Sequence, residues 1–153
     1  MKSFCRAGII AVAVILFAGA ARSQVPVKSD VGPVKEVGPI RSSAAYAETL
    51  LRRTELQADL EAMLPDYTEE NPKVLDARFE IAVLSKDMDR LFGVRPSETG
   101  RLTEALGRMI VRRAALATDL SRLLRSYSKD HPEVKRAKRR VEIFDAAIKE
   151  ILG

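Results

Sequence analysis

The strongest candidate for binding chemistry in this sequence is a cluster of positive side chains near its C-terminal end. The cluster comprises Lys135, Arg136, Lys138, Arg139 and Arg140. On a helix these side chains lie away from Val134, Ala137 and Val141, so they are expected to face outward. Such a face can bind an anionic polymer or a membrane surface, or it can be a solvated face that also contacts the acidic first half of the chain. Nucleic acid is the least favoured anion, because no aromatic side chains interleave the charges.

Side chains able to perform catalysis or to bind metals are few. The sequence holds one histidine, His131, and one cysteine, Cys5. A metal site made of His and Cys ligands, or a nucleophile activated by histidine, needs more such side chains. The chain also contains an internal repeat, in which His131 occupies the position that Asn71 has in the other copy. A position that holds histidine in one copy and asparagine in the other is typical of a turn. We therefore expect no catalytic residue, no metal and no cofactor, and predict that the chain is not an enzyme.

The N-terminal segment, residues 1–23, is predicted to be a cleaved signal peptide. Two basic residues precede an unbroken run of apolar and small side chains at residues 7–21. A membrane-spanning helix needs roughly 20 such residues, and the shorter run behind a basic start is typical of a secretory signal. Cleavage is expected near Ser23, with Ala20 as the alternative, and would leave a periplasmic or secreted protein. An uncleaved inner-membrane anchor is the other possibility.

Charge is spread unevenly over the rest of the chain. Residues 41–96 hold 8 basic and 11 acidic side chains, whereas residues 97–153 hold 13 basic and 8 acidic ones. Opposite net charges favour contact between the two halves, or head-to-tail association of copies. Cleavage of the signal would also remove Cys5, so the mature chain is expected to use no disulfide or thiol chemistry.

Residues 24–43 are predicted to form a linker. Pro26, Pro33 and Pro39 interrupt a segment without a long apolar period, and proline disfavours helix at its own position and at the one before it. An extended arm of this kind can be a spacer or a docking peptide for a partner.

An internal repeat with an offset of 60 residues organises the remainder. Residues 47–93 align with residues 107–153 without a gap, with 11 identical pairs. These include Arg52/Arg112, Arg53/Arg113, Tyr67/Tyr127, Pro72/Pro132 and Gly93/Gly153. Such self-similarity indicates one supersecondary unit used twice. We assign the two copies to residues 44–93 and 101–153, with a linker at 94–100.

Each repeat carries apolar stripes with helical spacing. Val134, Val141 and Ile148 recur every seven residues in the second copy, with a further apolar residue between each pair, and the first copy shows the same pattern. This spacing places the apolar side chains on one side of a helix, where they pack against another helix.

A residue–proline step marks the turn of each hairpin. Pro72 and Pro132 are expected at the first position of a helix, where the missing N–H has no cost. Each preceding helix should end near Tyr67 or Tyr127, because the residue before proline is pushed out of helical geometry. The predicted turn residues are Tyr67, Asn71, Pro72, Tyr127, His131 and Pro132.

Four helices are predicted, at about 44–67, 72–92, 98–127 and 132–152. Pro65 is expected to kink or shorten the first helix, and Ser97 or Thr99 is expected to cap the third. Short connections make consecutive helices antiparallel. The predicted fold is therefore all-α, with two tandem coiled-coil-like hairpins that either extend separately or pack as an up-down four-helix bundle.

Two arginines interrupt the apolar stripes at equivalent positions. Arg53 and Arg113 are expected to lay their aliphatic stems along the stripe while the guanidinium reaches water or an acid. The expected acids are Asp87 or Asp89 for Arg53, and Asp145 or Glu150 for Arg113.

The two hairpin turns resemble a turn known from one protein family. The motifs Tyr67-x3-Asn71-Pro72-x-Val74 and Tyr127-x3-His131-Pro132-x-Val134 are similar to the turn in the periplasmic coiled-coil segments of chain-length determinant proteins, the polysaccharide co-polymerases. The resemblance implies long antiparallel helices in proteins that oligomerise to control the export of surface polysaccharide.

These observations together predict a non-enzymatic exported helical protein that acts by association. The expected partner is another copy of the chain or another envelope protein. The alternative is a module that binds an anionic polysaccharide or lipid head group through the basic fourth helix.

Overall fold

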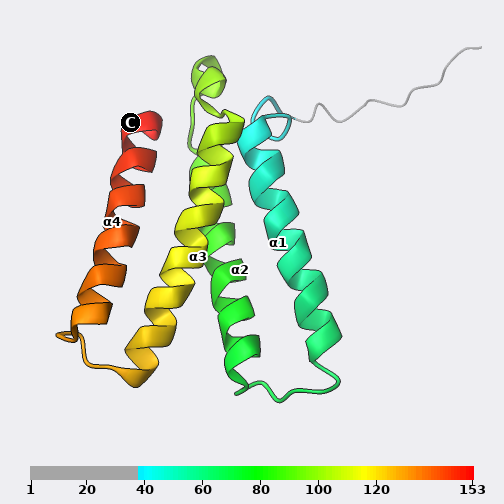
Figure 1. Ribbon diagram of the computed structural model, residues 1–153. Helices are drawn as coiled ribbons and strands as arrows, with labels where there is room; N and C mark the ends of the chain where they lie inside the picture. The colour runs from blue at the N-terminus through cyan, green and yellow to red at the C-terminus, as the bar shows by residue number, and fades with distance from the viewer. Residues whose placement is uncertain (1–37) are drawn as a thin grey trace, which may run out of the picture. The chain divides into compact units, whose positions relative to one another are not determined.

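The computed structural model describes residues 38–153. The predicted signal, residues 1–23, and most of the predicted linker lie outside this part of the chain. Residues 38–153 contain four long helices, namely α1 (Ala44–Met63), α2 (Pro72–Phe92), α3 (Glu104–Ser126) and α4 (Pro132–Leu152) (Figure 1). They pack in up-down order, which confirms the predicted all-α class of helical hairpins and favours a bundle over separate extended hairpins.

The first helix is shorter than predicted. It begins after Ser43, whose hydroxyl accepts a hydrogen bond from the backbone N–H of Tyr46 at 3.3 Å. It ends at Met63 instead of at residue 67, because Pro65 has no N–H and its ring clashes with the preceding turn. Capping and proline therefore set the two ends of α1.

The third helix begins later than predicted. Thr103, and not Ser97 or Thr99, is its N-cap, and it accepts a hydrogen bond from Leu106 N–H at 3.3 Å. Pro96–Arg101 forms a separate short 3₁₀ helix instead. Short 3₁₀ turns of this kind are common connectors between helices.

Helix α3 is the centre of the bundle. It packs extensively against α1, α2 and α4, and α1 also packs against α2. Among the described helices, α4 has an extensive interface with α3 alone. Figure 1 shows α1 and α4 on opposite sides of α3. The bundle is therefore not closed between α1 and α4.

A buried apolar cluster holds these helices together. Its members are Ala45, Leu56, Leu84, Leu91, Leu102, Leu106, Ile110, Ala114 and Ile148. All four long helices contribute to it, and α4 does so through Ile148, which is 1 % exposed. Full burial of a Leu or Ile side chain contributes about 1.5–3 kcal/mol, so this cluster is the main source of stability.

Helices α1 and α3 approach each other closely at a glycine. A Cβ added to Gly107 would lie 2.8 Å from the Cβ of Glu48 and 3.0 Å from the Cα of Ala45. No other residue type fits at this position without movement of one helix. Gly107 therefore sets the distance between α1 and α3.

Ion pairs join the acidic first hairpin to the basic second one. Asp76 on α2 accepts hydrogen bonds from Arg122 at 2.9 Å and Arg125 at 2.5 Å, both on α3. Asp87 on α2 pairs with Arg113 on α3. The contact that opposite net charges predict between the two halves is present within the chain.

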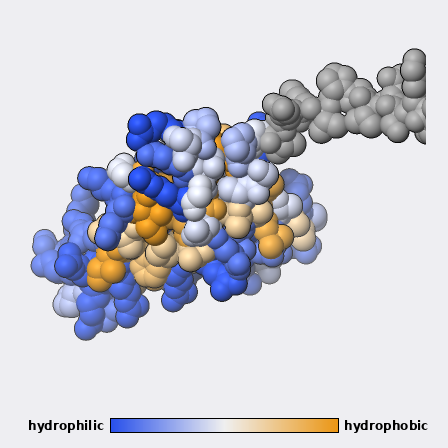
Figure 2. All heavy atoms as spheres, turned by 90° about the horizontal axis from the view of Figure 1, so that it is seen from above, coloured by the Kyte–Doolittle hydropathy of each residue, from blue (hydrophilic) through white to orange (hydrophobic). Residues whose placement is uncertain are grey.

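Apolar residues also reach the surface at the end that carries the 3₁₀ helix. Figure 2 views this end and shows them gathered in the middle with polar residues around them. Phe92, which is 43 % exposed, contacts Tyr46 edge to face, with the ring centroids 5.6 Å apart. Within residues 38–153, no helix is both long and apolar enough to cross a membrane.

Candidate interaction face along the third helix

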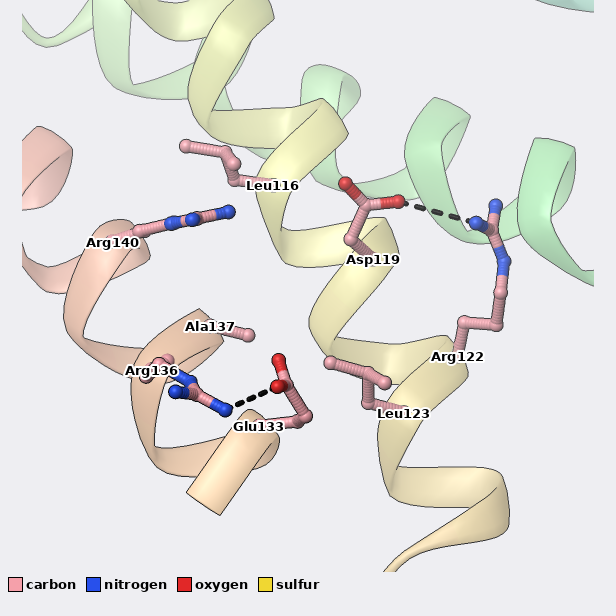
Figure 3. A pocket seen from close by; sticks show the side chains of 8 residues that line it. All are labelled: Leu116, Asp119, Arg122, Leu123, Glu133, Arg136, Ala137 and Arg140. Atoms are coloured by element: carbon pink, nitrogen blue, oxygen red, sulfur yellow. Dashed lines mark hydrogen bonds and ion pairs between the residues drawn. The ribbon is translucent and has the colours of Figure 1, made fainter. Parts of the chain in front are cut away.

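The surface of α3 that lies between α1 and α4 contains two hollows. One, of about 410 Å³, lies between α1 and α3 and is lined by Leu51, Arg108 and Arg112 among others. The second, of about 260 Å³, lies between α3 and α4 (Figure 3). Helical spacing places Arg108, Arg112, Ala115 and Asp119 on one stripe of α3, so both hollows belong to one surface. We call this stripe, with the flanking sides of α1 and α4, the open face.

The hollow between α3 and α4 is lined by both apolar and charged side chains. Leu116, Leu123 and Ala137 are the apolar residues that line it. Figure 3 shows Arg140 reaching from α4 toward α3, above Ala137. Arg136, one turn earlier, is instead bonded to Glu133 on its own helix. Arg140 is thus the lining cation whose guanidinium is directed across the hollow.

The five positive side chains predicted as an anion-binding face are all exposed on α4. Four of them pair with nearby acids of the second hairpin, in the pairs Lys135–Asp130 (3.3 Å), Arg136–Glu133, Lys138–Glu142 (3.9 Å) and Arg139–Glu142 (3.5 Å). No ion pair joins Arg140 to an acid within the described part of the chain. The acids in these four pairs all belong to the second hairpin, and α4 packs extensively against α3 alone.

The repeat explains why Arg140 has no acid beside it. In the first hairpin, Arg52 bonds to buried Glu80 on α2 at 3.0 Å and lies 3.6 Å from Glu55. At the equivalent positions the second hairpin has Arg112, Arg140 and Ala115. Both acids have been replaced, one of them by a second arginine. The second hairpin therefore carries excess positive charge where the first is neutralised internally.

The two stripe arginines differ in their environments. Arg113 pairs with Asp145 at 3.2 Å, as predicted, and also with Asp87. The prediction of Asp87 as a partner for Arg53 is wrong, because α2 turns this carboxylate toward α3. The Nε atoms of both arginines are buried without a hydrogen-bond partner, and no ion pair involves Arg53 within residues 38–153.

The predicted turn residues cap and order the two turns. The side chain of Asn71 accepts a hydrogen bond from Lys73 N–H at 2.9 Å, and Nδ1 of His131 accepts one from Glu133 N–H at 3.2 Å. Pro72 and Pro132 occupy the first helical positions. The Tyr127 ring stacks on His131 at 4.3 Å, and the ammonium of Lys73 lies 5.6 Å from the centre of the Tyr67 ring. The single histidine thus has a structural role in its turn.

Asp76 joins the two hairpins through ion pairs that the sequence analysis did not predict. Burial acts to raise the pKa of its carboxyl group, but hydrogen bonds from Arg125 and Arg122 and their positive charges together hold this pKa below its ordinary value. The repeat offered a signal, because the counterpart of Asp76 is Arg136, of opposite charge. Leu51 and Ile143, the most exposed of the large apolar side chains, were likewise not identified.

No group of three or more His, Cys, Asp and Glu side chains that could hold a metal ion occurs within residues 38–153. No protein-family model, curated protein or solved structure matches this chain.

Proposed function

We propose that this protein is a non-enzymatic exported helical protein that acts by self-association or as an adaptor in an envelope assembly. The open face carries the proposal. Because α4 packs on α3 and not on α1, one side of the bundle has no covering helix. Leu51 on α1 and Ile143 on α4 are 58 % and 55 % exposed. Large apolar side chains on both flanks of a hollowed surface are typical of a protein interaction site.

Two features of the sequence add to this proposal. The N-terminal pattern supports export to the periplasm or outside the cell. The turns at Asn71-Pro72 and His131-Pro132 resemble those of chain-length determinant proteins, and this favours an assembly that handles surface polysaccharide. A gene neighbourhood that encodes export of such a polymer would strengthen that more specific assignment.

Self-association is tested by measuring the mass of the purified protein. Light scattering coupled to size-exclusion chromatography, from low micromolar to millimolar concentration, is expected to show a mass of two or more chains. The mass of a single chain at the highest concentration would contradict self-association.

Binding of an anionic polymer or of lipid head groups by α4 is the alternative. Exposure of all five cations and the unneutralised Arg140 favour it. The test replaces Lys135, Arg136, Arg139 and Arg140 with serine and compares retention on heparin and on vesicles that contain anionic lipid. Reduced retention that is also salt-sensitive supports this function. Equal retention by the variant and the original protein would contradict it.

A further inference from the structure

We infer that the open face is closed by a second copy of this chain, with α1 of each copy packed against α4 of the other. The inference rests on the proposed self-association and deepens it by naming the partner and the contact. Helix α1 would supply to the partner's α4 the neighbour that α4 lacks within its own chain. Each copy contributes both helices, so the contact occurs twice in a symmetric dimer.

Charge complementarity points to a second copy. On the side of α1 that carries Leu51, the acidic side chains Glu55 and Asp59 are solvent-accessible. Glu55 is held only weakly by its own chain, through Arg52 at 3.6 Å. On the facing side of α4, Arg140 has no acid beside it within residues 38–153. Acidic and basic surfaces of the same molecule that cannot reach each other internally favour pairing between copies.

The spacing of the two helices matches along their length. On α1, Leu51, Glu55 and Asp59 follow one another at intervals of four, and on α4, Arg136, Arg140 and Ile143 are spaced by four and three. Each set therefore lies on one side of its helix. Figure 1 shows α1 and α4 spanning the same height of the bundle.

A two-fold axis parallel to α3 brings these stripes together. It places α1 antiparallel to the partner's α4 at the same level, because the two helices run in opposite directions within one chain. Ile143 then faces Leu51 of the other copy, and Arg140 faces its Glu55. The two most exposed large apolar side chains would become buried against each other.

The first hairpin supplies the precedent for this pairing. There, Arg52 is neutralised across the helix pair by Glu80 at 3.0 Å. The second hairpin has Arg140 in place of Glu80. In the dimer, Glu55 of the other copy provides the carboxylate that the second hairpin lacks. The ion-pair partner of Arg140 is therefore Glu55 of the other copy.

Charge reversal tests this contact in the full chain. Arg140→Glu places two acids opposite each other, and Glu55→Arg places two cations opposite each other. Each variant alone is expected to raise the Kd of self-association by about tenfold or more, because the contact occurs twice. An equal mixture of the two variants should restore association, since both contacts in the mixed dimer then pair opposite charges. Lys138→Glu, with the same kind of charge change on the side of α4 that faces away from Arg140 and Ile143, is the matched control and should leave the Kd unchanged.

Circular dichroism first establishes that each variant retains the helical content of the original protein. If the original protein associates and Arg140→Glu changes nothing, this face is not the interface, although self-association stands. If each variant dissociates but their mixture does not reassociate, the pairing of α1 with α4 is wrong. If the original protein stays monomeric at millimolar concentration, both this inference and the proposed self-association fail.

Discussion

At the scale of single residues, the two copies of the repeat use identical side chains differently. Both arginines have a buried Nε without a hydrogen-bond partner. Arg113 is 12 % exposed and forms ion pairs with Asp87 and Asp145, whereas no ion pair involves Arg53 within residues 38–153. An arginine paired with a buried carboxylate cannot be removed without cost, because the carboxylate then remains in a poorly solvated site. Removal of Arg53 leaves no buried carboxylate without a partner.

Replacement by leucine should separate these two environments. Arg113→Leu is expected to lower the free energy of unfolding by about 3 kcal/mol, since Asp87 keeps only a 3.4 Å contact with Arg90. Arg53→Leu should leave that free energy unchanged or raise it, because Arg53 has no ion-paired carboxylate to leave behind and a buried polar atom without a partner is removed. Urea denaturation followed by circular dichroism measures both. Equal losses in the two variants would contradict this distinction.

At the scale of helices and turns, local sequence signals account for most of the structure. Proline at the first position and a capping side chain before it start α2 and α4. Asn71 and His131 make the same hydrogen bond to the backbone N–H two residues ahead. Two different residue types thus cap the helices in the same way, because each presents an acceptor atom at a similar distance from its backbone.

Exchange of the two capping residues should therefore be tolerated. His131→Asn is expected to keep the cap and to change the free energy of unfolding little. His131→Ala should lower it by about 1 kcal/mol, because the N–H of Glu133 loses its acceptor. Thermal unfolding of both variants and of Asn71→Ala provides the comparison. A cost for His131→Asn as large as that for His131→Ala would show that stacking on Tyr127 matters more than the cap.

The approach of α1 to α3 should depend on the absence of a side chain at one position. Gly107→Ala is expected to lower the free energy of unfolding by about 2 kcal/mol, because the added methyl group meets Glu48 and Ala45 at 2.8 to 3.0 Å. The higher helix propensity of alanine offsets only about 1 kcal/mol. Gly100→Ala is the control, since an added Cβ there meets nothing within 4 Å. Chemical denaturation would show whether the two variants differ.

At the scale of the whole molecule, charge links the hairpins. Asp76 holds Arg122 and Arg125 from the neighbouring hairpin, and its side chain is 15 % exposed. Burial acts to raise the pKa of Asp76, but the hydrogen bonds and the positive charges of the two arginines together hold this pKa below its ordinary value. A lowered pKa in the folded state means that the stabilisation is present above the ordinary pKa and is lost as the pH falls through the folded value.

This linkage predicts a pH-dependent effect of Asp76→Asn. Near pH 7 the variant should be less stable than the original protein by about 1 kcal/mol. The difference should shrink as the pH falls below the ordinary pKa of an aspartate, about 4, toward the lower pKa that Asp76 has in the folded protein. Unfolding temperatures measured across this range test it, with Asp66→Asn, an exposed turn position, as the control. A difference that is the same at all pH values would contradict a role for the charge.

Features that depend on neighbouring residues were predictable from the sequence alone. The apolar period, the two residue–proline turns and the 60-residue repeat indicate four helices in two hairpins, because hydrogen bonding and side-chain spacing in a helix are local. The same signals identify Asn71 and His131 as turn residues. The boundaries missed at Met63 and Thr103 differ by a few residues, where proline and a 3₁₀ helix compete with the α-helical pattern.

Only the tertiary structure decided how the two hairpins pack and which surface remains open. The ion pair between Arg113 and Asp87 depends on which side of α2 faces α3, and this is a property of the packing of the two hairpins. The open face exists because α4 packs against α3 and leaves α1 uncovered. Contacts between distant segments depend on packing distances and crossing angles, which a periodic apolar stripe does not specify. The sequence thus determined the hairpins and the charges they carry, whereas their packing determined which of those charges stay without a partner.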